Sequence, residues 1–286
     1  MKNDYEILYD LPEGEFGDPG KGIRTRTIRA GTSLEVECFP ILRPEPTIER
    51  EKQKRQSGEA QRRLNLRNAR KRVMRLLEAN FGKGDVVLHL TIRSGNREIG
   101  TAGSAFDDRA ARKLLRNYLA KVKRRVKGAG RDPAEVKYLY VIESGKKAPA
   151  RYHFHMVIHA PGVSRETLEE LWPHGYANCD RLDTRGDGLA ALAKYMTKQI
   201  GLNGPKGDGI MRRWSGSRNL KEPRITTSDR KVSRRRASLV AGDVLNRGAE
   251  IFERLYPGYR CAEPPEVRYS DFAAGAWIYA RLRKIE

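Results

Sequence analysis

Alternation along two neighbouring segments constrains the fold of this chain more than any other feature. In RYHFHMVIH at 151–159, apolar and polar side chains alternate, so they fall on opposite faces of a β-strand. The segment at 137–143 also has strand character, and only a short stretch separates the two. Parallel strands need a crossover of about a dozen residues or more, whereas a short loop can join antiparallel strands. The sequence therefore predicts an antiparallel hairpin with one apolar face.

Periodic segments on either side extend this hairpin into a domain. Helical patterns begin and end with suitable residues, such as Ser164 as an N-cap and Gly128 as a terminator. The order β-α-β-β-α-β-α predicts an α+β domain over 81–205, an antiparallel sheet covered by helices on one face. The expected strands are 86–92, 137–143, 151–159 and 176–182, and the expected helices are 106–126, 164–172 and 187–200.

Two further parts flank this central domain. Residues 1–80 contain a predicted hairpin at 23–39 and a highly charged arm at 43–72 that continues into a helix. Residues 206–286 combine a basic loop with an amphipathic helix at 233–256. We therefore expect three parts: an N-terminal hairpin with a basic helical arm, a central core, and a basic loop with a C-terminal helical extension.

The charge of the chain points to a polyanionic partner. Its 286 residues include 57 Lys and Arg against 36 Asp and Glu, a formal net charge of +21. Basic side chains that neutralise phosphates release condensed counterions, which favours binding to nucleic acid. The excess is spread along the chain, so it belongs to a folded surface. Nucleic acid is the expected partner.

The sequence gives no indication of a membrane or secreted protein. It contains no run of eighteen apolar residues, and its first residues lack the apolar stretch of a secretory signal. The three cysteines show neither a disulfide framework nor the spacing of a zinc site. A cytoplasmic protein with reduced thiols and no membrane partner is expected.

The polar face of the strand at 151–159 carries a candidate metal site. His153 and His155 share that face with Cα atoms ~7 Å apart, so both imidazoles can reach one divalent ion. Glu143 ends the neighbouring strand and could complete a set suited to Mg²⁺ or Mn²⁺ when the substrate supplies phosphate oxygens. The alternative is two surface histidines and a solvated glutamate. His89, on the strand at 86–92, is expected to be structural.

The helix at 187–200 carries a candidate nucleophile. Tyr195 shares one side of this helix with Lys198 and Gln199, opposite the apolar packing side. A free phenol has a pKa near 10, so attack on a phosphodiester needs a nearby cation and a metal-polarised phosphate. Lys198 could supply that cation. The alternative is a tyrosine half-buried where the helix meets the sheet.

These motifs together resemble the HUH endonuclease domain of rolling-circle replication initiators from phages and plasmids. The resemblance rests on VVLHLTI, YVIESG, RYHFHMVIH and LAKYMTKQ, and on RRWSGSRNLKEPR at 212–224. It implies that His153 and His155 bind the metal, that Tyr195 is the nucleophile, and that Lys198 belongs to its Tyr-x-x-Lys motif. The third metal ligand would be Glu143 or Gln199. One tyrosine in the helix implies the single-tyrosine subclass.

A set of basic and aromatic residues is expected to hold DNA. Trp214 could stack on bases while neighbouring arginines hold phosphates, or it could be a partly buried loop residue among solvated charges. The candidate DNA-binding residues are Arg151, Lys194, Arg212, Arg213, Trp214, Arg218 and Arg224.

The resemblance implies an enzyme that nicks single-stranded origin DNA by transesterification. Tyr195 would be left joined to the 5′ end, and a 3′-hydroxyl would be released for a polymerase to extend. Host helicase and polymerase are the expected further partners. Within the same chemistry the alternative is a transposase or a mobilisation relaxase. Outside it, the alternative is a non-catalytic nucleic-acid-binding protein with structural histidines.

Overall fold

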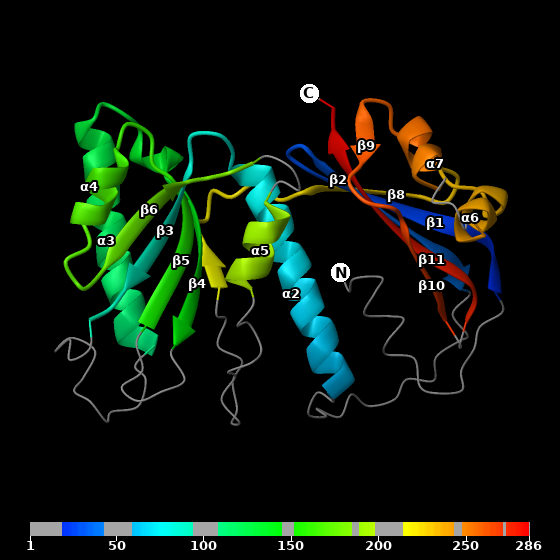
Figure 1. The fold of residues 1–286 in the computed structure, drawn as a ribbon, viewed down its shortest axis with the longest axis horizontal. Coiled ribbons are helices and arrows are strands. Elements are labelled where there is room, and N and C mark those ends of the chain that lie inside the picture. Colours follow the sequence, from blue (N-terminus) through cyan, green and yellow to red (C-terminus); the bar gives the residue numbers. More distant parts are fainter. Residues whose placement is uncertain are drawn as a thin grey trace. The chain divides into compact units, whose positions relative to one another are not determined.

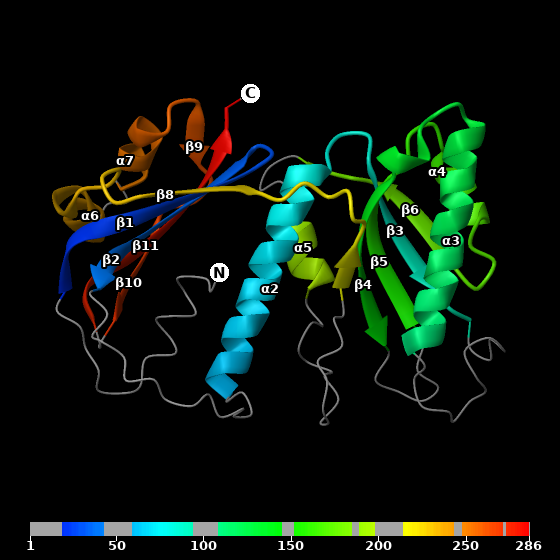
Figure 2. The ribbon, with the colours of Figure 1, turned by 180° about the vertical axis from the view of Figure 1, so that it is seen from behind.

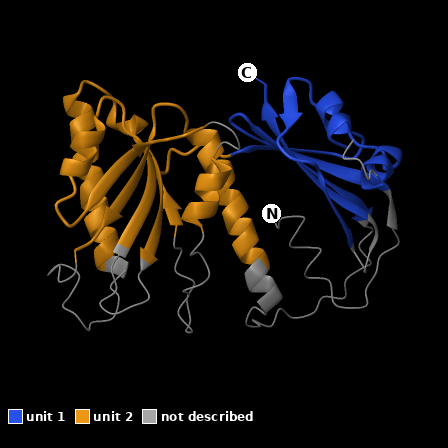
Figure 3. Cartoon of the chain, in the orientation of Figure 1, with its two compact units in different colours: residues 1–56, 223–286 blue, residues 57–222 orange. Residues whose placement is uncertain are grey.

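The chain is divided into two compact units (Figure 3). Unit 1 comprises residues 1–56 and 223–286, and unit 2 comprises residues 57–222. The computed structural model describes residues 19–42, 59–93, 108–144, 152–184, 189–197, 214–242, 248–270 and 273–285. Over these residues it contains six α-helices and two antiparallel sheets, so the predicted α+β class is confirmed.

Unit 2 is built on a five-stranded antiparallel sheet with strand order β6-β3-β5-β4-β7. Strands β4 and β5 form the predicted hairpin, with Tyr140 opposite Met156 in its register. Strand β3 lies on the other side of β5, with Leu88 opposite Met156. The strands are β3 (Val86–Thr91), β4 (Lys137–Ser144), β5 (Tyr152–His159), β6 (Ala177–Arg181) and β7 (Trp214–Gly216).

Helices cover both faces of this sheet (Figure 1, Figure 2). On one face lie α3 (Asp108–Gly128) and α4 (Arg165–Glu170), and on the other α2 (Glu59–Asn80) and α5 (Ala190–Met196). The expectation that helices cover one face is therefore wrong. The second layer arises because α2, expected within an N-terminal arm, packs its only apolar stripe on the sheet and on α5.

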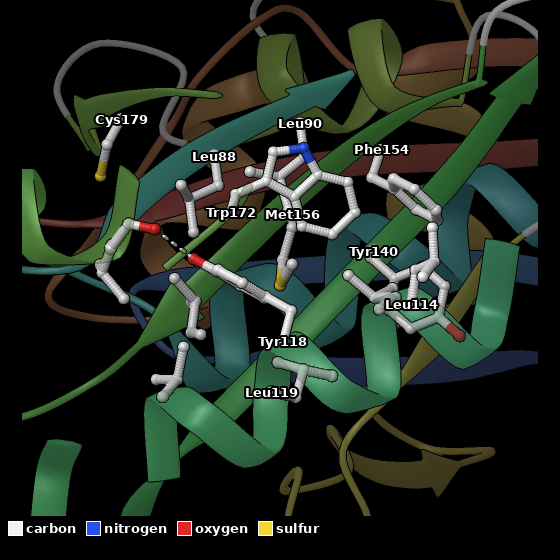
Figure 4. Packing of buried hydrophobic residues seen from close by; sticks show 14 of the residues in the cluster. Leu88, Leu90, Leu114, Tyr118, Leu119, Tyr140, Phe154, Met156, Trp172 and Cys179 are labelled. Atoms are coloured by element: carbon white, nitrogen blue, oxygen red, sulfur yellow. Dashed lines mark hydrogen bonds between the residues drawn. The ribbon is translucent and has the colours of Figure 1, made fainter. Parts of the chain in front are cut away.

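The packing under α3 shows how the first layer is fixed (Figure 4). Tyr118 is 1% exposed, lies edge-on to Trp172, and donates a 2.9 Å hydrogen bond from its hydroxyl to the carbonyl oxygen of Leu168. The ring thus contributes apolar burial while its one polar atom is satisfied. Ser164 caps α4 as predicted, accepting from the amide of Thr167 at 3.2 Å.

Unit 1 is a second sheet with order β10-β11-β2-β1-β8, with β9 paired to β11. The predicted N-terminal hairpin is confirmed as β1 (Pro19–Ala30) and β2 (Ser33–Leu42). Helices α6 (Arg234–Ala241) and α7 (Gly248–Leu255) pack on it. The other strands are β8 (Arg224–Ser228), β9 (Tyr259–Cys261), β10 (Glu266–Ser270) and β11 (Ala273–Lys284).

The expected C-terminal helical extension is only partly helical. Strand β11 pairs with β2, so the end of the chain completes the sheet that the N-terminal hairpin begins. Its buried residues Ile278, Ala280 and Leu282 alternate with more polar ones, which is a strand pattern. The expected boundaries at 1–80, 81–205 and 206–286 thus differ from the compact units, because long-range strand pairing joins the two ends.

Two other expectations concern the cysteines and membrane-spanning helices. Cys38, Cys179 and Cys261 are free thiols, and burial raises the pKa of Cys38 and of Cys179 to about 12. Among the helices of the described ranges, none is both long and apolar enough to span a bilayer.

Candidate active site

Polar side chains gather on the face of the unit 2 sheet that α2 and α5 partly cover. Residues paired across neighbouring strands point to the same face. One such row joins Glu143 on β4, His153 on β5 and Thr91 on β3. The next row brings His155 on β5 beside His89 on β3. The sheet register alone therefore places three histidines and a carboxylate together.

His155 stands at the centre of a hydrogen-bonded cluster. Its Nε2 lies 2.9 Å from Oε2 of Glu143, and its Nδ1 lies 2.9 Å from Nδ1 of His89. An ionised carboxylate only accepts, so Nε2 of His155 donates to Glu143. In a neutral ring Nδ1 then accepts, and His89 donates from its own Nδ1. The side chains of His155 and Glu143 are 11% and 25% exposed, so both are largely screened from water.

Burial favours the neutral form of His155 and His89, because it lowers the pKa of both imidazoles. Desolvation lowers the pKa of His155, and the nearby His153 adds to this, although Glu143 opposes it. Desolvation also lowers the pKa of His89, with a further contribution from His155 and an opposing one from Asp180. Neutral imidazoles can act as acceptors or as metal ligands at neutral pH.

Helix α5 holds Tyr195 over this cluster. The Tyr195 ring centroid is 5.2 Å from that of His155 and 6.0 Å from that of His89, with both pairs edge-on. The helix is anchored by buried Ala193 and Met196, and the amide of Leu189 donates to a Glu78 carboxylate oxygen on α2 at 2.9 Å. Tyr195 itself remains 53% exposed, so a substrate can reach its hydroxyl.

The structure thus brings together Tyr195, His153, His155 and Glu143 from three separate elements. It adds His89, which the sequence suggested was only structural. The sequence could have placed His89 on this face, because alternation along β3 puts its side chain opposite the core-facing leucines. Within the ranges that the structure describes, no three His, Cys, Asp or Glu side chains are already arranged to hold a metal ion.

The remaining histidines have local partners. Nδ1 of His159 lies 2.6 Å from a carboxylate oxygen of Asp85, where β5 ends. The ring of His174 lies edge-on to Trp172 in the loop before β6.

The candidate DNA-binding residues belong to both units, and several of them lie outside the described residues. Trp214 is half-buried, pairs with Val141 through β7 and packs against the core below α2, so it lies in a strand and not in the loop that the structural alternative expected. Lys194 and Arg218 are exposed in unit 2, whereas Arg224 is exposed in unit 1. The predicted residues Lys198, Gln199, Arg151, Arg212 and Arg213 lie outside the described residues.

Comparison with known proteins bears on the same region. Residues 85–200 match a family model for replication-associated proteins of the ORF2 type. Searches of curated proteins and of solved structures find no significant match. The matched segment begins one residue before β3 and ends beyond α5, so it contains the whole histidine, glutamate and tyrosine cluster. The match, over less than half of the chain, supports a replication initiator.

Proposed function

We propose that this protein is a single-tyrosine HUH endonuclease that nicks single-stranded origin DNA to begin rolling-circle replication. The observation that carries the proposal is the position of Tyr195. Its exposed ring stands 5.2 Å from the ring of His155, which is hydrogen-bonded to Glu143, inside the segment that matches the replication-associated family. A nucleophile, neutral imidazoles and a carboxylate on one accessible face suit phosphoryl transfer.

The proposed reaction is a transesterification. The hydroxyl oxygen of Tyr195 attacks phosphorus and loses its proton, and the bond from phosphorus to the 3′ oxygen breaks. The 3′ oxygen gains a proton and leaves as a 3′-hydroxyl, while the 5′ phosphate stays joined to the tyrosine. One phosphate ester replaces another, so the same hydroxyl can reverse the step without a nucleotide cofactor.

The proposed ligands are imidazole and carboxylate groups, a donor type that suits a divalent metal. His153, His155 and Glu143 would hold Mg²⁺ or Mn²⁺, with Gln199 as the alternative third ligand. Nε2 of His155 and Oε2 of Glu143 already lie 2.9 Å apart, so two of the proposed ligands are neighbours. When bound, the ion would polarise the phosphate and stabilise its developing charge.

His89 would orient one of these ligands, His155, through a hydrogen bond. A metal-bound imidazole usually donates its other N–H to a fixed acceptor, which sets its tautomer and orientation. Nδ1 of His89 lies 2.9 Å from Nδ1 of His155 and can serve as that acceptor when Nε2 of His155 is a ligand. We therefore assign His89 as a positioning residue.

The test is whether a covalent adduct forms. Full-length protein would be incubated with labelled single-stranded origin DNA and Mn²⁺, then run on a denaturing gel. A labelled band at the mass of protein plus DNA supports the proposal. A transposase or relaxase would give the same band on a different DNA site, whereas a non-catalytic nucleic-acid-binding protein would shift DNA in a native gel and give no adduct.

A further inference from the structure

Tyr176 is the exposed aromatic residue that continues the active-site face. It precedes β6, where Ala177 pairs with Leu90, and the amide of Thr91 donates to the Tyr176 carbonyl at 2.8 Å. This bond places the backbone of Tyr176 beside Thr91, one residue beyond the end of the β6 ladder. Ala177 packs towards the core below α3, so alternation places Tyr176 on the opposite face, with Asn178. Its side chain is 68% exposed.

The backbone beneath this ring is held firmly. The Tyr176 amide donates to the Thr91 hydroxyl oxygen at 3.1 Å, and the Trp172 indole N–H donates to the Thr91 carbonyl at 2.8 Å. At Gly175 a Cβ atom would lie 2.3 Å from that same carbonyl oxygen, so only glycine permits the approach. A loop fixed at this many points presents the Tyr176 ring with little loss of conformational entropy on binding.

Local packing does not account for the exposed ring. The hydroxyl of Tyr176 makes no hydrogen bond to any residue in the described part of the chain. Tyr269 in unit 1 provides a contrast, since it is 69% exposed but donates from its hydroxyl to the Ala241 carbonyl at 2.9 Å. Tyr176 therefore offers an open aromatic surface on a rigid support.

We propose that Tyr176 is a stacking platform for an unpaired base of the single strand that Tyr195 cleaves; this rests on the proposed function. Glu143, His153 and Thr91 form one row across the sheet, and the backbone of Tyr176 is hydrogen-bonded to Thr91 at the end of that row. Two strand spacings separate His153 from Tyr176, which is about 10 Å. The stacked base would thus belong to a nucleotide close to the cleaved phosphate.

The partner class follows from chemistry. Unit 2 contains 34 Lys and Arg against 17 Asp and Glu, so its surface attracts a phosphate backbone. Aromatic rings bind the flat faces of bases, which a duplex hides within its stack and a single strand exposes. A basic unit with an open ring close to the row that carries His153 therefore fits single-stranded rather than double-stranded nucleic acid.

The test compares binding to strands with and without bases. In a Tyr195→Phe background, which removes cleavage, fluorescence anisotropy would measure affinity for labelled oligo-dT, for an abasic strand of equal length and for a duplex. Tyr176→Ala should weaken oligo-dT binding about 5-fold to 150-fold, because stacking is worth about 1–3 kcal/mol per base. Tyr176→Phe should bind like the parent, since the ring is kept. Tyr269→Ala is the matched control for an equally exposed tyrosine.

The abasic strand shows whether a loss of affinity in Tyr176→Ala comes from base stacking. If Tyr176 stacks on bases, Tyr176→Ala and the parent should bind this strand equally. Equal affinities for oligo-dT, or the same loss on the abasic strand, would overturn the proposal. The stacking proposal and the proposed function can fail separately. If Tyr195 forms the adduct but Tyr176→Ala does not change DNA affinity, only stacking is rejected. If Tyr176→Ala weakens binding in a base-dependent way but no adduct forms, only the endonuclease is rejected.

Discussion

The two units have similar architecture and very different chemistry. Each is an antiparallel sheet with helices, yet unit 2 contains 34 Lys and Arg against 17 Asp and Glu, while unit 1 contains 23 against 19. Unit 2 also carries all five histidines of the chain. Unit 1 buries two carboxylates more deeply, with Glu35 and Glu37 each 2% exposed against 9% for Glu78 and 7% for Asp85 in unit 2. The difference leads us to predict that the proposed DNA binding and catalysis are concentrated in unit 2.

The largest effect is expected on adduct formation, when the proposed nucleophile of unit 2 is compared with a tyrosine of unit 1. Tyr195→Phe should abolish the covalent adduct, because only the attacking oxygen is removed, while affinity for single-stranded DNA stays nearly unchanged. Tyr269→Phe in unit 1 should form the adduct at the parent rate. Denaturing gels would measure adduct formation and anisotropy would measure binding. An adduct that persists in Tyr195→Phe would show that another tyrosine attacks.

The next effect concerns metal binding. EDTA should stop cleavage and Mg²⁺ or Mn²⁺ should restore it. Calorimetry with Mn²⁺ should show that His155→Ala and His153→Ala lose more affinity than the roughly 10–100-fold typical of an outer-shell change. His174→Ala is the control, since its ring contacts Trp172 in the loop before β6. Equal losses in all three variants would refute a two-histidine site.

A smaller effect is expected at His89. His89→Ala removes the partner 2.9 Å from Nδ1 of His155, so Mn²⁺ affinity should fall about 10–100-fold without being abolished. His89→Gln, which keeps a side-chain acceptor, should recover part of that affinity. Nitrogen NMR of the metal-free protein would report the imidazole tautomers directly. Unchanged Mn²⁺ affinity in His89→Ala would return this residue to a purely structural role.

The sequence predicted the central sheet well and its surroundings less well. Alternation at 151–159 was sufficient to place His153 and His155 on one face, because period-two patterns are local. It could not show that α2 covers that face or that β11 completes the sheet of unit 1, because both depend on long-range contacts. The link between His89 and His155 likewise depends on a register that joins residues far apart in the chain.

The smallest expected effect compares unit 2 alone with the whole chain. Residues 1–60 cannot simply be deleted to test the charged arm, because β1 and β2 lie at the centre of the unit 1 sheet. Unit 2, by contrast, is one continuous segment, 57–222, and contains both hydrophobic clusters that pack on its sheet. It should fold alone and form the adduct at the same DNA position.

Salt dependence would then locate the phosphate contacts. On single strands each neutralised phosphate contributes a slope of about −0.7 to log affinity against log salt. Because the charge excess lies in unit 2, the slope for residues 57–222 should differ from that of the full chain by no more than about one or two such contacts. Titrations of origin and scrambled oligonucleotides at several salt concentrations would measure both slope and preference. A much flatter slope for unit 2 would show that the nearly balanced unit 1 holds the backbone, and lost preference for the origin would show that unit 1 reads sequence.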